Sequence, residues 1–266
     1  CHAMAPGYRV EGRHVSFGNL AQSSVADIWQ NEAYQTFRRR VVEGDFPVVF
    51  AKRDVAAVGN PTDGTIFRPG GDLMLRDLSS PSAETVNITA SYTQGTGDVS
   101  DPEVSYDGRR VLFSMRGPND RTWNVWEYDL DTEGLHRLIA DDAVADEGDD
   151  VDPAYLPDGR IIFSSNRQEK SRAVLAADNV EPYPHLDEYE RERAILLHIM
   201  NGDGTEIRQI SFNQSHDRNP TVLSTGEIMF ARWDHVGNNN HFPIFFTNPD
   251  GTNMFVQYGA FSPGNS

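Results

Sequence analysis

Polar side chains recur at two fixed positions before a proline in three stretches of the chain, and their types suit metal binding. The position four residues before the proline holds Asp98, Asp149 and His216, and the position directly before it holds Asp101, Asp152 and Asn219. Asp150 and Asp217 stand beside them. If these side chains converge, their oxygens could hold a hard cation such as Ca²⁺, which takes 6–8 oxygen ligands. The alternative is that the aspartates cap tight turns by accepting backbone N–H groups.

A second group of metal-capable or acid–base residues comes later in the chain. Asp234, His235 and His241 lie close together in the sequence and could form a site at the rim of a channel. A structural role, with the imidazoles bonded to loop carbonyls, is the competing interpretation. The chain has neither a HExxH helix motif nor a serine or cysteine in a nucleophile elbow.

Each of the three prolines opens a repeat. The proline is followed by a turn with a glycine and then by an apolar run around a phenylalanine: RRVLFSMR at 109–116, RIIFSSNR at 160–167 and EIMFARW at 227–233. A second apolar run, a polar turn and a short closing run complete each unit. Units of about four short strands predict an all-β fold, a β-propeller of four-stranded antiparallel blades. The first strand of a blade runs nearest the axis, so the recurring polar positions would meet at one mouth of the channel.

The repeats divide the chain into two regions. Residues 1–46 form a predicted helical segment, with one helix over 25–43, Ser23 or Ser24 as its N-cap and Gly44 as its stop signal. Residues 47–266 form a partial propeller of about four blades, whose first blade, 47–90, lacks its innermost strand. An open fan leaves strand edges exposed, so we expect the parent protein to continue beyond residue 266. A small four-bladed propeller closed by the N-terminal segment is the alternative.

Composition excludes several classes of function. The net charge of −17 and the pI near 4.7 would repel nucleic acid, and no apolar stretch reaches the roughly 20 residues of a membrane span. The single cysteine is residue 1, so residues 1–266 contain no disulfide pair, Cys-based zinc site or CxxCH haem motif. We therefore expect no cofactor within this span apart from Ca²⁺. The start at Cys1, without a leader, indicates a piece of something longer.

The third unit carries a long polar insertion at 168–193, between its second and third strands. Loops of this length in compact domains are usually functional. Its aromatic and basic residues are predicted contacts for a partner protein: Tyr183, His185, Tyr189, Arg191 and Arg193. A solvated loop without a partner is the alternative.

Three segments resemble a known family. GDVSDPEVSYDGRRVLFSMR, DDVDPAYLPDGRIIFSSNRQ and DRNPTVLSTGEIMFARWDHV are similar to TolB-type propeller repeats, and more narrowly to the propeller region of the hydrazine synthase alpha subunit and its relatives. The resemblance covers about 47–266. It implies a periplasmic or extracytoplasmic module of a larger redox assembly, with c-type haem only in flanking domains.

The N-terminal 46 residues resemble a different family. FGNLAQSSVADIWQNEAYQTFRRRVVEGDFP is similar to the tail of the SPASM-type domain of radical-SAM enzymes, without the cysteines that follow there. This resemblance implies a cytoplasmic location, with any iron–sulfur cluster in flanking domains.

Two functions follow from the sequence. The first is a non-catalytic propeller that docks protein domains or subunits of a larger, redox assembly. The second is part of an enzyme, an oxidoreductase by family resemblance, whose active site lies at the channel mouth or in haem or iron–sulfur domains outside this span. The absence of any catalytic motif in the chain favours the first.

Overall fold

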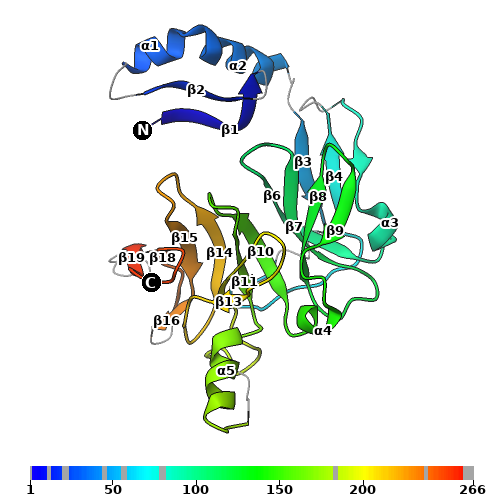
Figure 1. Cartoon of the computed structure of the whole chain (residues 1–266), viewed down its shortest axis with the longest axis vertical. Coiled ribbons are helices and arrows are strands. Elements are labelled where there is room, and N and C mark those ends of the chain that lie inside the picture. The colour runs from blue at the N-terminus through cyan, green and yellow to red at the C-terminus, as the bar shows by residue number, and fades with distance from the viewer. Residues whose placement is uncertain are drawn as a thin grey trace.

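The computed structural model describes residues 2–10, 13–19, 24–43, 47–54, 59–77, 82–181, 185–236 and 239–259 of the 266-residue chain. Four antiparallel sheets follow one another like the blades of a fan (Figure 1). In the part of the chain that is described, no helix is long and apolar enough to cross a bilayer.

The four sheets are numbered in chain order. Sheet 1 has three strands, β3 (Val48–Lys52), β4 (Asp72–Arg76) and β5 (Val86–Asn87). Sheet 2 has β6 (Asp98–Val104), β7 (Arg110–Arg116), β8 (Asn124–Asp129) and β9 (Gly134–Arg137). Sheet 3 has β10 (Asp150–Tyr155), β11 (Ile161–Ser165), β12 (Leu196–Met200) and β13 (Arg208–Gln209). Sheet 4 has β14 (Asp217–Val222), β15 (Ile228–Arg232), β18 (Ile244–Thr247) and β19 (Phe255–Tyr258). The order of each sheet follows the sequence, so the predicted all-β architecture of four-stranded blades is confirmed.

The predicted strand equivalence also holds. Phe113, Phe163 and Phe230 lie on β7, β11 and β15, each of which is the second strand of its sheet and pairs with the third. Sheet 1 contains the strands predicted as second, third and fourth, and no first strand belongs to it among the described residues.

The residue before each proline bends the first strand. Asp101, Asp152 and Asn219 have left-handed backbone angles, with φ of 53°, 54° and 52°. At each one the pairing of the first and second strands shifts register, which marks a β-bulge. Aspartate and asparagine tolerate this conformation better than other residues with side chains. The Asp-Pro or Asn-Pro corner therefore recurs because it builds the same bulge in each sheet.

Apolar side chains hold neighbouring sheets together in three clusters. Phe113 belongs to the cluster between sheets 1 and 2, Phe163 to that between sheets 2 and 3, and Phe230 to that between sheets 3 and 4. On the other face of the same strands, Leu112 and Ile162 pack forward against the next sheet. Each second strand thus alternates between its two neighbours, as the two-residue period of a strand requires.

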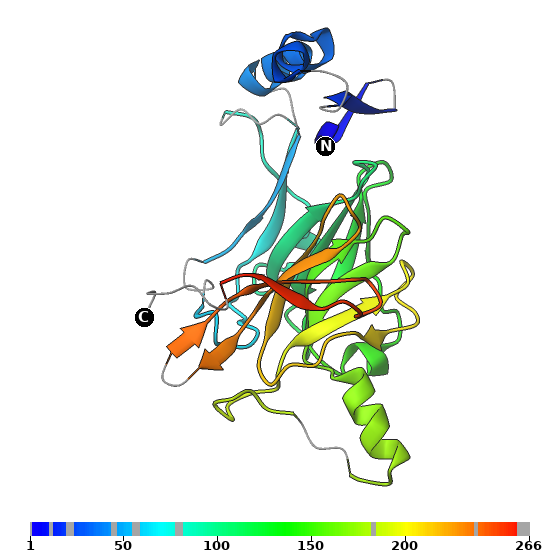
Figure 2. The same cartoon turned by 90° about the vertical axis from the view of Figure 1, so that its left-hand side faces the viewer.

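Short helices connect the strands. They are α3 (Ala90–Thr93), α4 (Asp142–Ala145) and α5 (Glu169–Ala177). Helix α5 begins the insertion at 168–193 and extends away from the sheets (Figures 1 and 2). A hairpin of β16 (Asp234–Val236) and β17 (Asn239–His241) leaves sheet 4 between β15 and β18.

The N-terminal region differs from the expected single helix. It contains a hairpin of β1 (His2–Val10) and β2 (Arg13–Asn19), then α1 (Val25–Gln30) and α2 (Glu32–Glu43), and lies apart from the sheets (Figure 1). Ser24 caps α1 as predicted, because its Oγ accepts the N–H of Asp27 and donates to its carboxylate.

The prediction of one continuous helix over 25–43 was wrong, because Asn31 interrupts it. The Asn31 side chain accepts the N–H of Tyr34 at 2.8 Å and starts a second helix there. Trp29 is 45% exposed and is covered on one side by the guanidinium of Arg38, 3.9 Å from its ring centre. Gly44 lies outside the described residues.

Candidate functional site at the inner edge of the sheets

A cavity of about 350 Å³ opens where the first strands of sheets 2, 3 and 4 meet. Its polar lining comes from those strands and from Arg53, and its apolar lining includes Trp123, Trp233 and Phe242. The polar residues on the first strands and just before β14 are Ser100, Asp101, Asp152, His216, Arg218 and Asn219. Segment 59–66, between β3 and β4, closes another side. The structure thus brings together four of the recurring residues, Asp101, Asp152, His216 and Asn219.

The residues four positions before the prolines all accept a hydrogen bond from a backbone N–H group of the preceding sheet. Asp98 accepts the N–H of Arg68, Asp149 accepts that of Trp123, and His216 Nδ1 accepts that of Ile195 at 3.1 Å. Each donor lies on the segment that leads into β4, β8 or β12 of the preceding sheet. The recurring side chain therefore ties its own sheet to the one before it, which is a contact between sheets rather than the cap of a tight turn.

Arginines neutralise most of the aspartates. The pairs are Asp98 with Arg53, Asp150 with Arg167, Asp152 with Arg218 and Asp217 with Arg232. Asp150 and Arg167 are both fully buried, and the guanidinium Nε donates to the carboxylate at 3.0 Å. Paired charges of this kind keep a buried carboxylate satisfied without a cation. These four aspartates are thus neutralised by arginines of the chain itself.

Among the described residues, Asp149 and Asp101 have no ion pair with an arginine. Asp149 accepts hydrogen bonds from Trp123, Thr65 and Asn166 instead, whereas Asp101 lies at the cavity. Asp101 Oδ2 accepts a hydrogen bond from Ser100 Oγ at 2.7 Å. Burial, and then the negative charge of Asp152, raise the pKa of Asp101 to about 6. Asp101 therefore changes its protonation state near neutral pH, inside the cavity.

His216 has a defined tautomer. Because Nδ1 accepts the Ile195 N–H, its lone pair points to the backbone and the proton of the neutral ring lies on Nε2. Burial, followed by the charge of Arg218, lowers the pKa of His216 to about 4, so the ring is neutral at pH 7. The ring is buried, and a backbone hydrogen bond with Thr62 partly offsets this lowering of the pKa.

The insertion at 168–193 folds back against segment 59–66, which lines the cavity. Gly64 N–H donates to Glu192, and Arg191 donates to the Thr62 carbonyl at 2.9 Å. Tyr189 donates to Asn240 at 2.9 Å and lies against Trp233. The second half of the insertion thus joins segment 59–66 to sheet 4.

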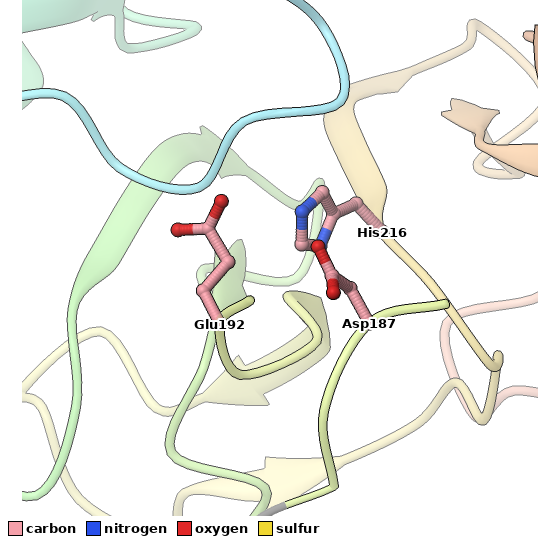
Figure 3. Close-up of side chains that lie close together, drawn as sticks. All are labelled: Asp187, Glu192 and His216. Atoms are coloured by element: carbon pink, nitrogen blue, oxygen red, sulfur yellow. The ribbon is translucent and has the colours of Figure 1, made fainter. Parts of the chain in front are cut away.

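This strap places two carboxylates beside His216. Asp187, Glu192 and His216 each present a metal-ligand type of atom, and these atoms lie within 4.8 Å of one another (Figure 3). A cation would need the lone pair of His216 Nε2, which carries the proton in this tautomer. His216 therefore does not suit the cation site predicted from the sequence.

The rim residues are divided between two faces of the β16–β17 hairpin. Asp234 lies opposite His241, whereas the neighbouring His235 pairs with Asn240 and contacts Glu188 at 3.0 Å. Residues on successive positions of a strand face opposite ways. The structure therefore does not gather Asp234, His235 and His241 into one site.

The predicted partner contacts are used largely within the chain. Tyr189 and Arg191 belong to the strap described above, and Arg193 pairs with Leu186 in a β-bridge. The backbone of His185 exchanges hydrogen bonds with the Gln168 side chain. Tyr183 lies outside the described residues.

Sequence reasoning missed the arginine partners and the strap carboxylates. A signal for three of the arginines was present, since Arg53, Arg167 and Arg232 follow the phenylalanine of the second strand by two to four residues. Arg218, the partner of Asp152, lies on β14 and has no such signal. The positions of Asp187 and Glu192 depend on the path of an irregular insertion, for which the repeat pattern carries no signal.

Comparisons with known proteins give two different results for the two regions. Residues 1–49 match the model of the SPASM iron-sulfur cluster-binding domain. No curated protein matches the sequence. Hydrazine synthase from Kuenenia stuttgartiensis superposes with a TM-score of 0.61 at 19% identity, over 80% of this chain and 32% of that one. A putative TolB from Agrobacterium tumefaciens gives a TM-score of 0.41 at 16% identity, over 73% and 78% of the two chains.

The likeness to hydrazine synthase is one of fold. This chain spans about a third of the length of that protein, and the sheets described above are the blades of a propeller module. An iron–sulfur cluster bound by cysteine needs about four thiolates. The chain has one cysteine, so its residues do not fit a cluster of their own.

Proposed function

We propose that this chain is a β-propeller interaction module of a larger redox assembly, resembling the hydrazine synthase alpha subunit. In this assembly, further β-sheets stack against sheet 4 and sheet 1. Haem or iron–sulfur groups would belong to flanking domains, and an extracytoplasmic location goes with the propeller resemblance. The support is the face of sheet 4 that points away from sheet 3.

Met229 carries the argument. It is the repeat equivalent of Leu112 and Ile162, each of which packs against the next sheet. Met229 pairs across the strands with Phe246, and Phe246 pairs with Phe255. Phe255 is 46% exposed, and no further sheet covers this row among the described residues. The equivalent residues of sheets 2 and 3 are buried against the next sheet. An apolar row that lacks such a cover indicates a contact with protein.

A site-specific photo-crosslinker tests the stacking. Benzoylphenylalanine replaces Phe255 in the protein expressed in its native host, and Val174, exposed on α5, is the matched control position. We expect crosslinks from position 255, and far fewer from 174, to a strand-forming segment outside residues 1–266. Mass spectrometry identifies the peptide. Equal crosslinking at both positions, or none at 255, would contradict the proposal.

A second function, catalysis at the cavity, is favoured by one observation. Asp101 is a carboxyl group with a pKa of about 6 inside a cavity, which is the property of a general acid or base. The Asp101→Asn variant tests it once an activity of the whole protein is known. We then expect loss of activity together with loss of the pH dependence near 6.

A further inference from the structure

Strand β3 leaves one edge of sheet 1 open. In sheets 2, 3 and 4 the second strand lies between a first and a third strand, whereas β3, the equivalent second strand, pairs only with β4 among the described residues. An edge strand of an antiparallel sheet presents N–H and C=O groups without partners at alternate residues. Within the described part of the chain, no backbone hydrogen bond outside the β3–β4 ladder reaches residues 48–52. The edge can therefore accept another strand.

The apolar side chains of β3 lack the cover that their equivalents have. Phe50 holds the place in β3 that Phe113, Phe163 and Phe230 hold in the other second strands, so Val48 stands two residues before it. Val48 is 36% exposed, whereas the residues at its repeat position are fully buried: Val111, Ile161 and Ile228. On the first strands these three lie opposite apolar residues, which are Val104, Tyr155 and Val222. A strand added to β3 would accordingly carry an apolar residue opposite Val48.

The position two residues after the phenylalanine shows how first and second strands match each other. In each complete sheet its side chain and the one directly opposite are of compatible kinds. The pairs are Met115 with Val99, Ser165 with Asp150 and Arg232 with Asp217. The first pair is apolar, the second is joined by a hydrogen bond of 2.6 Å, and the third is an ion pair of 2.8 Å.

In β3 this position holds a lysine. Lys52 is exposed and forms no ion pair with any residue that the structure describes. It stands where Arg232 stands in sheet 4, and Arg232 meets Asp217 on the first strand. Opposite charges directly across two strands attract, and like charges repel. A strand that fits this edge therefore carries an acidic residue opposite Lys52.

The bulge of the first strands fixes the spacing of these two features. The residue opposite the second strand's Phe+2 position and the one opposite its Phe−2 position are five residues apart, as in Asp150 and Tyr155 or Asp217 and Val222. The residue with positive φ and its proline lie between them. The fitting sequence is thus an acidic residue, any residue, Asp or Asn, Pro, any residue, and an apolar residue.

We propose that the open edge of β3 binds an extended segment of this sequence type as an added antiparallel strand, with its acidic residue opposite Lys52. The segment belongs to the further sheets of the assembly, and in this respect the inference rests on the proposed function. A second copy of the chain does not supply it, because the described first strands β6, β10 and β14 are each paired within their own sheet. The added strand gives sheet 1 the four strands of the other sheets.

A synthetic peptide tests the proposal on the purified chain. Its sequence, SHDRNPTVL, is that of residues 215–223 and reproduces the first strand of sheet 4. Calorimetry measures binding, and hydrogen exchange followed by mass spectrometry locates it. We expect saturable binding and slower amide exchange in residues 48–52, and neither with a scrambled peptide of the same composition. No binding, or slower exchange only outside 48–52, would overturn the proposal.

A charge swap assigns the binding to Lys52. Lys52→Glu places two acidic side chains opposite each other and should weaken binding about 5-fold or more. The peptide with Asp217→Lys should bind this variant better than it binds the parent. Lys170→Glu, which changes the other lysine of the chain, exposed on α5, is the matched control and should leave binding unchanged. Equal weakening by the two lysine changes, or no gain from the swapped peptide, would contradict the pairing.

The result can be separated from that of the crosslinking at Phe255. Crosslinks from position 255 without peptide binding would overturn the strand addition and leave the stacking on sheet 4 in place. Peptide binding that depends on Lys52, without crosslinks from position 255, would retain the strand site on β3 and reject the stacking.

Discussion

The first strands of the sheets carry two groups of polar residues that differ in how they are satisfied. Asp150 forms a closed pair with Arg167, in which both side chains are fully buried. Asp101 and His216, at the cavity, have no such ion pair: the Asp101 carboxylate accepts a hydrogen bond from Ser100, and the His216 ring is neutral at pH 7. The difference teaches that the same position in a repeat can hold a side chain in a buried ion pair in one sheet and leave it without an arginine partner at the cavity in another.

The closed pair should show the largest effect on stability. Arg167→Met leaves Asp150 buried without its cation and should lower the free energy of unfolding by about 3–5 kcal/mol. Arg160→Met removes the cation of an exposed pair with Asp158 and should change it by less than about 1 kcal/mol. Urea denaturation of both variants measures the contrast. Equal effects would mean that the buried pair is no more important than a surface one.

The two faces of the propeller module can be compared at equivalent residues. Ile162→Ala removes a side chain buried between sheets 3 and 4 and should cost about 2–5 kcal/mol. Met229→Ala, at the equivalent position of sheet 4, should cost less than about 1 kcal/mol in the isolated chain, because no sheet covers it among the described residues. Denaturation curves decide the point. A large loss for Met229→Ala would show that this face is already covered.

Much of the fold could be predicted from the sequence, because each four-stranded sheet comes from a recurring sequence pattern. The prolines, the glycine turns and the phenylalanines at 113, 163 and 230 fixed the strand order and the shared register. The N-terminal hairpin could not be found in this way, since β1 and β2 belong to no repeat. The break at Asn31 needed a local side-chain hydrogen bond to override helical periodicity.

The site was only partly predictable, for a related reason. Convergence of Asp101, Asp152 and Asn219 follows from the position of first strands in a propeller, and the cavity contains all three. Whether each aspartate meets an arginine depends on side-chain geometry between strands. Asp187 and Glu192 reach His216 only because an irregular insertion folds back, and no periodic pattern encodes such a path.

Because Asp101 has no arginine partner, we expect its ionisation to make the free energy of unfolding depend on pH, unlike that of the aspartates in ion pairs. An unfolded aspartate has a pKa near 3.9, and that of Asp101 in the folded protein is about 6. Between these values the folded state keeps a proton that the unfolded state releases, so this group lowers stability as pH rises from about 4 to 6. Asp101→Asn removes the penalty. Its gain in unfolding free energy over the parent should therefore grow between pH 4.5 and 7.5, up to about 3 kcal/mol.

Urea denaturation of the Asp101→Asn variant and its parent at both pH values measures this difference. His216 titrates in the same window but is common to both proteins, so its contribution cancels. A difference that stays constant with pH would mean that Asp101 ionises like an exposed aspartate.

The smallest expected effect is that of calcium on the melting temperature. It tests whether arginines or a bound cation neutralise the aspartates. Asp98, Asp150, Asp152 and Asp217 each have an arginine partner, so we expect no Ca²⁺ ion to be needed at the inner edge of the sheets. Scanning calorimetry in 2 mM calcium, a concentration of roughly 100 times a dissociation constant of about 20 µM, would reveal a site of that strength as a stabilisation of about 2.7 kcal/mol. We expect the melting temperature to be the same in calcium and in chelator. A rise in the melting temperature in calcium that is lost in Asp101→Asn would show instead that Asp101, which has no arginine partner, recruits a cation, and that the ion pairs around it rearrange to admit one.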